Sequence, residues 1–268
     1  MNENKIQLNL NIPYIKSNKD FKEQLLISSH ERSGTHFLMN SIDYAFKYYS
    51  SKKFINFDYF RLGSFINFYS KKSLEDFFLN LYNNKNVSLL KSHFNASFFE
   101  KIETKVLKKI KFIYIYRNLI ETLKSFWIYI NNVNWNEGPK NKQFSEFCFE
   151  KPRGQLIRYD DIIGNNLIER YFYNLKSWVD FSKKNEVLFI NYRDLNTNYT
   201  KTIDQISKYI NLPIINENIF DRSSYFEVNF KENKKIFYDE ENNEKIKDHY
   251  KKLLERDKIN SKIMTEII

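Results

Sequence analysis

Cysteine, proline and glycine are scarce in this chain of 268 residues, which contains one Cys, four Pro and five Gly. The single thiol, Cys148, has no second cysteine with which to form an intrachain disulfide. This usage is typical of a reducing compartment, so we expect a cytoplasmic protein. No Pro-, Gly- or Ser-rich linker divides the chain. We therefore expect a single domain over residues 1–268, in which residues 1–20 form an N-terminal extension.

Long hydrophobic runs and a segregated charge are also missing. No apolar run approaches the roughly 20 residues that span a bilayer, and the first residues contain no signal-peptide core, so we expect no transmembrane segment. The net charge of +10 would suit a polyanion, but acidic residues are interspersed with the basic ones. Without a zinc-finger or RNA-recognition signature, the sequence favours a solvated Lys-rich surface over a nucleic-acid partner. The spacing of Cys, His, Asp and Glu suggests no metal site.

Short β-branched and aromatic runs alternate with segments of helical periodicity. The pattern predicts strands over residues 25–29, 87–91, 111–116 and 187–191, and helices over 35–48, 96–108, 119–131, 166–183, 197–210 and 242–256. This alternation indicates the α/β class, with a central parallel sheet flanked by helices. Residues 51–70 are aromatic and irregular, and they either wall an acceptor pocket or pack in the core. Residues 133–164 have little periodicity and are expected to form a substrate or lid loop.

The loop between the first strand and the first helix, Ser28-Ser-His-Glu-Arg-Ser-Gly-Thr35, is the most informative segment. Backbone N–H groups of such a loop and the following helix N-terminus attract an anion. Gly34 permits close approach of the backbone, and the loop carries a cation and several donors, namely Arg32, Ser33, Thr35 and His36. It is not a Walker A loop, since it lacks the G-x-x-x-x-G-K-[ST] pattern. On the loop alone, an ordinary strand-to-helix turn is an equal alternative.

Two further strand ends carry residues of the same character. The run Val87–His93 reads as a strand that ends in Lys91, Ser92 and His93. Residues 111–116 are followed by Arg117 and by Asn118, a good helix N-cap, and Ser125 lies about two helical turns further on. Ligands bind at the carboxyl ends of strands in open α/β sheets. We therefore expect these side chains to face the same crevice as the loop.

These motifs, taken together and in order, resemble those of the PAPS-dependent sulfotransferases. The run Ser-His-Glu-Arg-Ser-Gly-Thr-His-Phe37 is similar to the family's 5′-phosphosulfate loop, and this resemblance implies a P-loop-like phosphosulfate loop. Arg117 with Ser125 resembles the 3′-phosphate motif, and Lys91-Ser92-His93 resembles Lys-Thr-His. The strand 187–191, followed by Tyr192, resembles the family's later strand that ends Tyr-Glu-Asp-Leu. The matches span about residues 24 to 213.

The resemblance implies transfer of a sulfuryl group from PAPS to a hydroxyl (or amine) acceptor, with release of PAP (adenosine 3′,5′-bisphosphate) and without a metal. It implies His93 as general base, with Lys91 and Arg32 neutralising developing charge. The donor would be bound by a larger set of residues, namely Arg32, Ser33, Gly34, Thr35, His36, Phe37, Arg117, Ser125 and Tyr192. Within that set, Arg117 and Ser125 would hold the 3′-phosphate, and Phe37 with Tyr192 would enclose adenine.

Several alternatives stay open at this point. The family's late Arg-Lys-Gly motif is absent, and Lys231, Lys234 and Lys235 are candidates to replace it. Glu31 is a second candidate for the base. The acceptor can be a small molecule such as a phenol or amine, or a sugar or lipid head group. The competing functions are an ATP-dependent P-loop kinase and a degenerate, non-catalytic protein that binds a nucleotide or polyanion.

Overall fold

The structure is a computed structural model, and it describes residues 24–46, 55–56, 76, 79, 89–132, 143–159, 164–221 and 240–268. Within these residues a five-stranded sheet has the order β2-β3-β1-β4-β5, and every neighbouring pair is parallel. The strands are β1 (Gln24–Ser28), β2 (Ile55–Asn56), β3 (Leu89–Ser92), β4 (Ile110–Tyr116) and β5 (Val187–Asn191). The α/β class and the parallel sheet expected from the sequence are confirmed.

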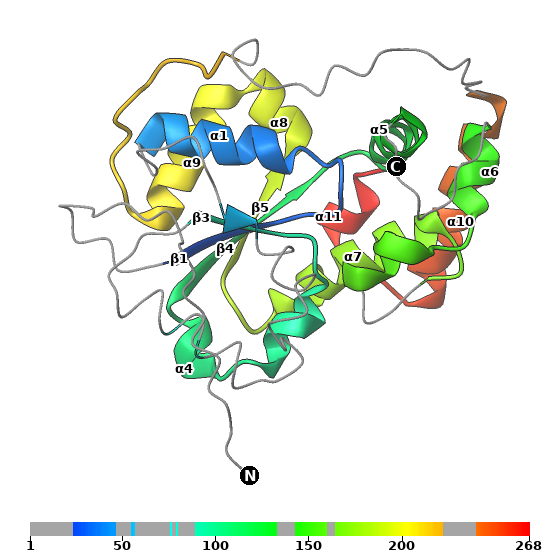
Figure 1. Cartoon of the computed structure of the whole chain (residues 1–268), viewed down its shortest axis with the longest axis horizontal. Coiled ribbons are helices and arrows are strands. Elements are labelled where there is room, and N and C mark those ends of the chain that lie inside the picture. The colour runs from blue at the N-terminus through cyan, green and yellow to red at the C-terminus, as the bar shows by residue number, and fades with distance from the viewer. Residues whose placement is uncertain are drawn as a thin grey trace, which may run out of the picture.

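Helices cover both faces of the sheet (Figure 1). Figure 1 shows α1 (Thr35–Phe46), α8 (Tyr192–Thr197) and α9 (Tyr199–Ile210) together on one side of it. On the other side lie η1 (Ala96–Lys101), α4 (Thr104–Leu107) and α7 (Leu167–Phe181), with α6 (Phe144–Phe149) and α10 (Asn243–Arg256) packed against α7. The remaining elements are α5 (Leu119–Asn132), η2 (Gly154–Tyr159), η4 (Glu240–Asn242) and α11 (Lys262–Thr265).

Alternate residues of the central strands point into two separate cores. In β1, Leu25 and Ile27 belong to the core under α1 and α9, whereas Leu26 belongs to the core under α7. In β4, Ile113 and Phe112 divide in the same way. Successive side chains of a strand point to opposite faces, so a strand buried on both faces reads as one continuous apolar run. This explains why the sequence shows short apolar blocks without polar alternation.

The order of the strands places the topological switch point of the sheet at the carboxyl end of β1. The chain passes from β1 to β2 and β3 on one side of it, and then to β4 on the other side. The point where the direction of winding reverses is where open α/β sheets bind ligands. The loop at residues 29–34 leaves β1 at this point.

Several boundaries differ from those expected. The predicted helix 96–108 consists of η1 and α4, separated by Ile102 and Glu103 in extended conformation. The predicted helix 197–210 is preceded by the separate helix α8, and the two are divided at Asn198. The described part of 133–164 is not irregular, because it contains α6 and η2, whose Phe144, Phe147, Cys148 and Leu156 lie in the core. Short segments of one or two turns give too little periodicity to be predicted.

Some expectations fall outside the described residues. These concern the N-terminal extension 1–20, most of the aromatic segment 51–70, and the three candidate lysines Lys231, Lys234 and Lys235.

Candidate active site

The loop after β1 is fixed by left-handed backbone and by internal hydrogen bonds. Arg32 has φ 67° and Gly34 has φ 103°, both in the left-handed region. The Ser33 N–H donates to the His30 carbonyl at 3.3 Å, and the hydroxyls of Ser29 and Thr35 are 2.5 Å apart. The loop thus leads directly into the first turn of α1. The N–H groups of a first turn have no carbonyl oxygen of a preceding helical turn as hydrogen-bond partner. Such a turn favours an anion.

Two observations test whether the loop residues fit a phosphosulfate. The Ser33 hydroxyl is buried and, within the described part of the chain, has no hydrogen-bond partner. A buried hydroxyl without a protein partner in this position is suited to donate a hydrogen bond to an oxygen of an anion. A Cβ on Gly34 would lie 2.3 Å from Cδ2 of Tyr192, so only glycine fits under that ring. The loop therefore offers hydrogen-bond donors of the kind that an anionic group requires.

Arg32 lies against helix α5. Its Nε donates to the Ser125 hydroxyl at 3.1 Å, and its guanidinium lies 5.0 Å from the centre of the Tyr129 ring. Ser125 and Tyr129 are one turn apart on α5, so they form neighbouring contacts on one helix face. Ser125, which the sequence assigned to the 3′-phosphate together with Arg117, thus contacts the cation of the 5′ loop.

Arg117 lies at the end of β4 beside Tyr192. Its guanidinium is 4.4 Å from the centre of the Tyr192 ring, and its Nε donates to Glu121 Oε2 at 2.8 Å. The N-cap expected at Asn118 is present, since its Oδ1 accepts from the Glu121 N–H at 3.1 Å. The Glu121 carboxylate is more than half exposed, and exposed ion pairs of this type contribute at most about 1 kcal/mol. The Arg117–Glu121 ion pair is therefore weak.

The C-terminal segment holds the turn that carries Arg117, a feature that the sequence analysis did not predict. The Leu119 N–H at the start of α5 donates to the Ile267 carbonyl at 2.8 Å. The Tyr116 hydroxyl donates to the Glu266 carboxylate. The C-terminal segment thus provides a hydrogen-bond acceptor for an N–H group in the first turn of α5.

Lys91 and His36 add to the polar lining of this edge. Lys91 lies near the end of β3, pairs with Ile27 of β1 in the sheet and is 7% exposed. His36 is an exposed residue in the first turn of α1. Partial removal of the ring from water by neighbouring protein, and next the positive charges of Lys91 and Arg32, lower the pKa of His36. The imidazole is therefore neutral near pH 7 and can serve as a donor without adding charge.

His93 directly follows β3 and is fixed by the start of the loop. Its Nδ1 is 2.9 Å from the Ser29 carbonyl oxygen. A carbonyl only accepts, so Nδ1 carries the hydrogen and Nε2 of the neutral ring carries the lone pair. Burial, and next the charge of Lys91, lowers the pKa of His93 well below 6.5, although Glu31 opposes the shift. The ring is therefore neutral at pH 7, in the tautomer that can take a proton at Nε2.

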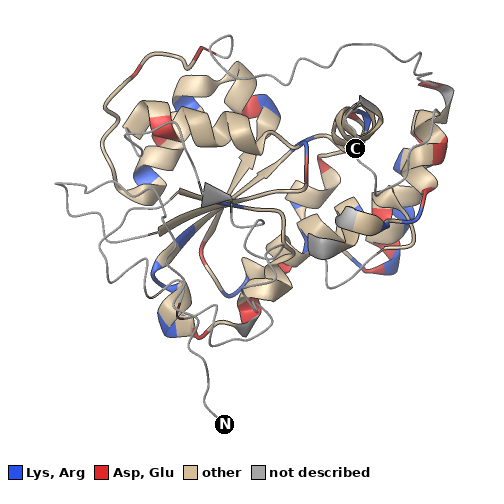
Figure 2. Ribbon diagram, viewed as in Figure 1, with Lys and Arg blue, Asp and Glu red and all other residues tan. Residues whose placement is uncertain are grey.

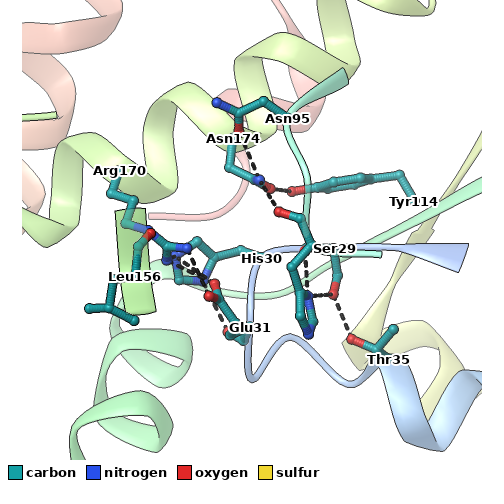
Figure 3. Close-up of polar contacts among 10 residues, drawn as sticks. Ser29, His30, Glu31, Thr35, Asn95, Tyr114, Leu156, Arg170 and Asn174 are labelled. Carbon is teal, nitrogen blue, oxygen red and sulfur yellow. Dashed lines mark hydrogen bonds and ion pairs between the residues drawn. The ribbon is translucent and has the colours of Figure 1, made fainter. Parts of the chain in front are cut away.

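Glu31 and His30 are bound to Arg170 of α7, a residue that the sequence analysis missed (Figure 3). Arg170 donates through Nη1 to Glu31 Oε2 at 2.8 Å and through Nη2 to Glu31 Oε1 at 2.7 Å. Burial alone would raise the pKa of Glu31, but the Arg170 guanidinium holds it well below its usual range. Both carboxylate oxygens are thus occupied, which is a poor arrangement for a base.

A second polar residue of α7, Asn174, holds the segment after β3. Its Nδ2 donates to the His93 carbonyl at 3.1 Å and to Asn95 Oδ1 at 3.0 Å, and its Oδ1 accepts from the Tyr114 hydroxyl at 2.7 Å (Figure 3). Arg170 and Asn174 are four residues apart and share one face of α7. The only sequence signal was this pair of polar residues on an otherwise apolar helix face.

Phe37 of α1 lines a cavity. The cavity has a volume of about 410 Å³ and is lined by Phe37, by residues 195–201 and by Ile219 and Phe220. The Phe37 and Tyr192 rings are 6.3 Å apart at an angle of 70°, an edge-to-face contact and not a parallel pair. Tyr192 covers Gly34 and is not part of the cavity lining, so its expected contact with adenine stays a prediction.

Charges of both signs are interspersed over the described helices (Figure 2). Pairs such as Lys176–Asp180 on α7 and Lys247–Glu244 on α10 are typical. In the described ranges no helix is long and apolar enough to cross a membrane. Nor do three or more His, Cys, Asp or Glu side chains gather there as potential metal ligands.

Together, a parallel sheet and a loop at its carboxyl edge whose donors suit an anion, beside a neutral buried histidine, define an α/β protein with a P-loop-like site. The sulfotransferase domain family matches residues 22–265, and the chain belongs to this family. It is therefore a sulfotransferase, an enzyme of sulfuryl transfer.

The fold is also shared with a solved sulfotransferase and a solved retinol dehydratase. Mouse sulfotransferase SULT7A1, complexed with PAP, is similar with a TM-score of 0.55 and 15% identity, over 92% of this chain and 88% of that chain. Retinol dehydratase, in a complex with retinol and PAP, is similar with a TM-score of 0.52 and 14% identity, over 86% of this chain and 81% of that chain. No curated protein sequence matches the chain.

Proposed function

We propose that the enzyme transfers the sulfuryl group of PAPS to a hydroxyl or amine acceptor and releases adenosine 3′,5′-bisphosphate. The observation that carries this proposal is the convergence of the 29–34 loop, Lys91 and His93 at one edge of the sheet. An orphan buried hydroxyl, two nearby cations and a neutral imidazole form a set that suits an anionic donor and a protic acceptor. The PAP complexes of two proteins with this fold agree with that donor.

The donor is proposed to lie across the β1 and β4 ends. The loop, with the Ser33 hydroxyl and the N-terminus of α1, would hold the 5′-phosphosulfate. Arg117 would hold the 3′-phosphate after release from Glu121, and Ser125 would contact both Arg32 and that phosphate. The cavity beside Phe37 is suited to a flat aromatic base, since its lining combines the rings of Phe37, Tyr199 and Phe220 with polar side chains.

His93 is the proposed general base. The Ser29 carbonyl leaves the lone pair at Nε2, and this nitrogen would accept the acceptor's proton as the new O–S or N–S bond forms. The bond between sulfur and the bridging oxygen breaks, and the electron pair stays on the departing phosphate. Lys91 and Arg32 would offset this charge. Glu31, the alternative base, is less well supported because Arg170 occupies both of its oxygens.

The acceptor is proposed to be a small molecule that carries a hydroxyl or amine. Retinol dehydratase, which shares the fold, was solved in a complex with retinol and PAP. A neutral acceptor also suits a site whose base is an uncharged imidazole.

Calorimetry with two nucleotides tests the donor assignment. Wild type should bind adenosine 3′,5′-bisphosphate about tenfold or more tightly than 5′-AMP, since a charged contact to the 3′-phosphate is worth about 1.5–3 kcal/mol. Arg117→Ala should remove most of this difference. Arg256→Ala, an exposed arginine of α10 that contacts Asp257 and Tyr173, is the control and should keep it. Equal affinity for both nucleotides, or tight Mg²⁺-dependent binding of ATP, would contradict the proposal.

A further inference from the structure

The donor loop contains a carboxylate, which is unfavourable beside an anionic ligand unless a cation neutralises it. Glu31 is 8% exposed, and Arg170, which is fully buried, meets it with two hydrogen bonds of 2.7 and 2.8 Å. Paired donors of this geometry fix orientation as well as charge. Glu31 is thus held in one position by helix α7.

Arg170 is itself held by three elements. Its Nη1 donates to His30 Nε2 at 2.7 Å, and its Nε donates to the Leu156 carbonyl of η2 at 3.1 Å. Its guanidinium also lies 6.0 Å from the Phe126 ring centre on α5. Figure 3 shows the guanidinium between Leu156 and the pair His30 and Glu31. With all three nitrogens engaged, the side chain is a rigid support and not a mobile surface arginine.

The backbone at Arg32 lies between two side-chain contacts. Glu31 is bound to α7, and the next side chain, Arg32, is bound to Ser125 of α5. Between these two anchors the backbone of Arg32 has φ 67°, a conformation that non-glycine residues seldom adopt. Such a conformation persists only where the surroundings impose it. Removing the α7 anchor would release one side of the turn.

We propose that Arg170 is a positioning residue for the donor loop. Through Glu31 it maintains the left-handed turn at Arg32 and cancels the negative charge beside the phosphosulfate. The ligand named here rests on the proposed function, whereas the effect on the loop does not. Arg170 makes no contact with the donor in this proposal, so its effect should largely vanish when the Glu31 side chain is removed.

The test is a double-mutant cycle on nucleotide binding. Arg170→Met should weaken binding of adenosine 3′,5′-bisphosphate by about tenfold or more in the wild-type background, because it leaves a buried unpaired carboxylate. In the Glu31→Ala background, where the partner of Arg170 is absent, the same substitution should change the affinity less than threefold. Lys176→Met removes an ion pair on the same helix, with Asp180, and is the matched control that should leave affinity unchanged. An equal loss in both Glu31 backgrounds, or no loss in either, would overturn the inference.

Hydrogen exchange of residues 29–36 in the free protein gives a second measurement. Arg170→Met should accelerate exchange in this segment, and Lys176→Met should not. If Arg170→Met does not fold, Arg170→Lys replaces it, since lysine keeps the charge but lacks the paired donors, and it should show the same faster exchange. Wild type that fails to bind the nucleotide would refute the proposed function, while faster loop exchange would still support positioning. Unchanged exchange and affinity in a nucleotide-binding enzyme would refute positioning alone.

Discussion

Acidification from pH 7 to pH 5 should destabilise this protein through His30. The imidazole is 1% exposed, donates from Nδ1 to the Glu31 carbonyl at 2.9 Å and accepts at Nε2 from Arg170 at 2.7 Å. A protonated ring would lose the Arg170 bond and place two positive charges in contact. Burial, opposed by Glu31 and reinforced by Arg170, lowers the pKa of His30 to about 4.

The magnitude follows from the difference between folded and unfolded pKa values. The unfolded chain binds a proton at His30 below pH 6.5, whereas the folded protein does so only near pH 4. The stability from this group is therefore complete above pH 6.5 and is lost as the pH falls toward 4. Between pH 6.5 and pH 5, a span of about 1.5 pH units, proton binding to the unfolded chain lowers the free energy of unfolding by about 2 kcal/mol, at about 1.36 kcal/mol per unit. Ordinary carboxylates still remain charged at this pH.

Urea unfolding of wild type and His30→Asn at pH 7 and pH 5 measures this contribution. Asparagine has a donor and an acceptor but does not titrate in this range, so the variant should lose about 2 kcal/mol less on acidification. His93, whose pKa is also lowered, contributes with the same sign in both proteins and cancels in the comparison. Any constant cost of the substitution cancels likewise. Equal losses in the two proteins would show that His30 is not the buried neutral ring described above.

Three further predictions concern the site itself. Arg32→Lys should retain much of kcat, because it keeps a cation near the leaving phosphate, whereas Arg32→Ala should lose about 10²-fold in steady-state assays; normal turnover by the alanine variant would exclude the loop as the phosphosulfate site. His93→Ala should lower kcat by about 10²–10⁴-fold while calorimetry shows nearly unchanged binding of adenosine 3′,5′-bisphosphate; full activity would return attention to Glu31. Gly34→Ala should lower the free energy of unfolding by about 1–3 kcal/mol, since its φ is 103° and its Cβ would lie 2.3 Å from Tyr192; a thermal melt identical to wild type would contradict this.

The features that the sequence predicted well are those that depend on neighbours along the chain. The strand 187–191 matches β5, and the strand at 111–116 and the helix at 119–131 lie within β4 and α5. The N-cap at Asn118 and the glycine at position 34 follow from local backbone requirements. Because parallel strands end at one edge of a sheet, the convergence of the loop, Lys91 and Arg117 also followed from the order of the elements.

The side-chain pairings across the site were decided only by the tertiary structure. Glu31 and Arg170 are 139 residues apart, and nothing in the local pattern of α7 indicates which loop its polar face meets. The pairing of Arg32 with Ser125 likewise depends on how α5 packs beside the loop. Periodicity determines which face of a helix is buried, but the partner of a buried charge depends on the position of the helix over the sheet. The sequence by itself therefore determined the strands, the loop and the chemistry at the sheet edge, and the packing of α5 and α7 determined which charges hold that loop in place.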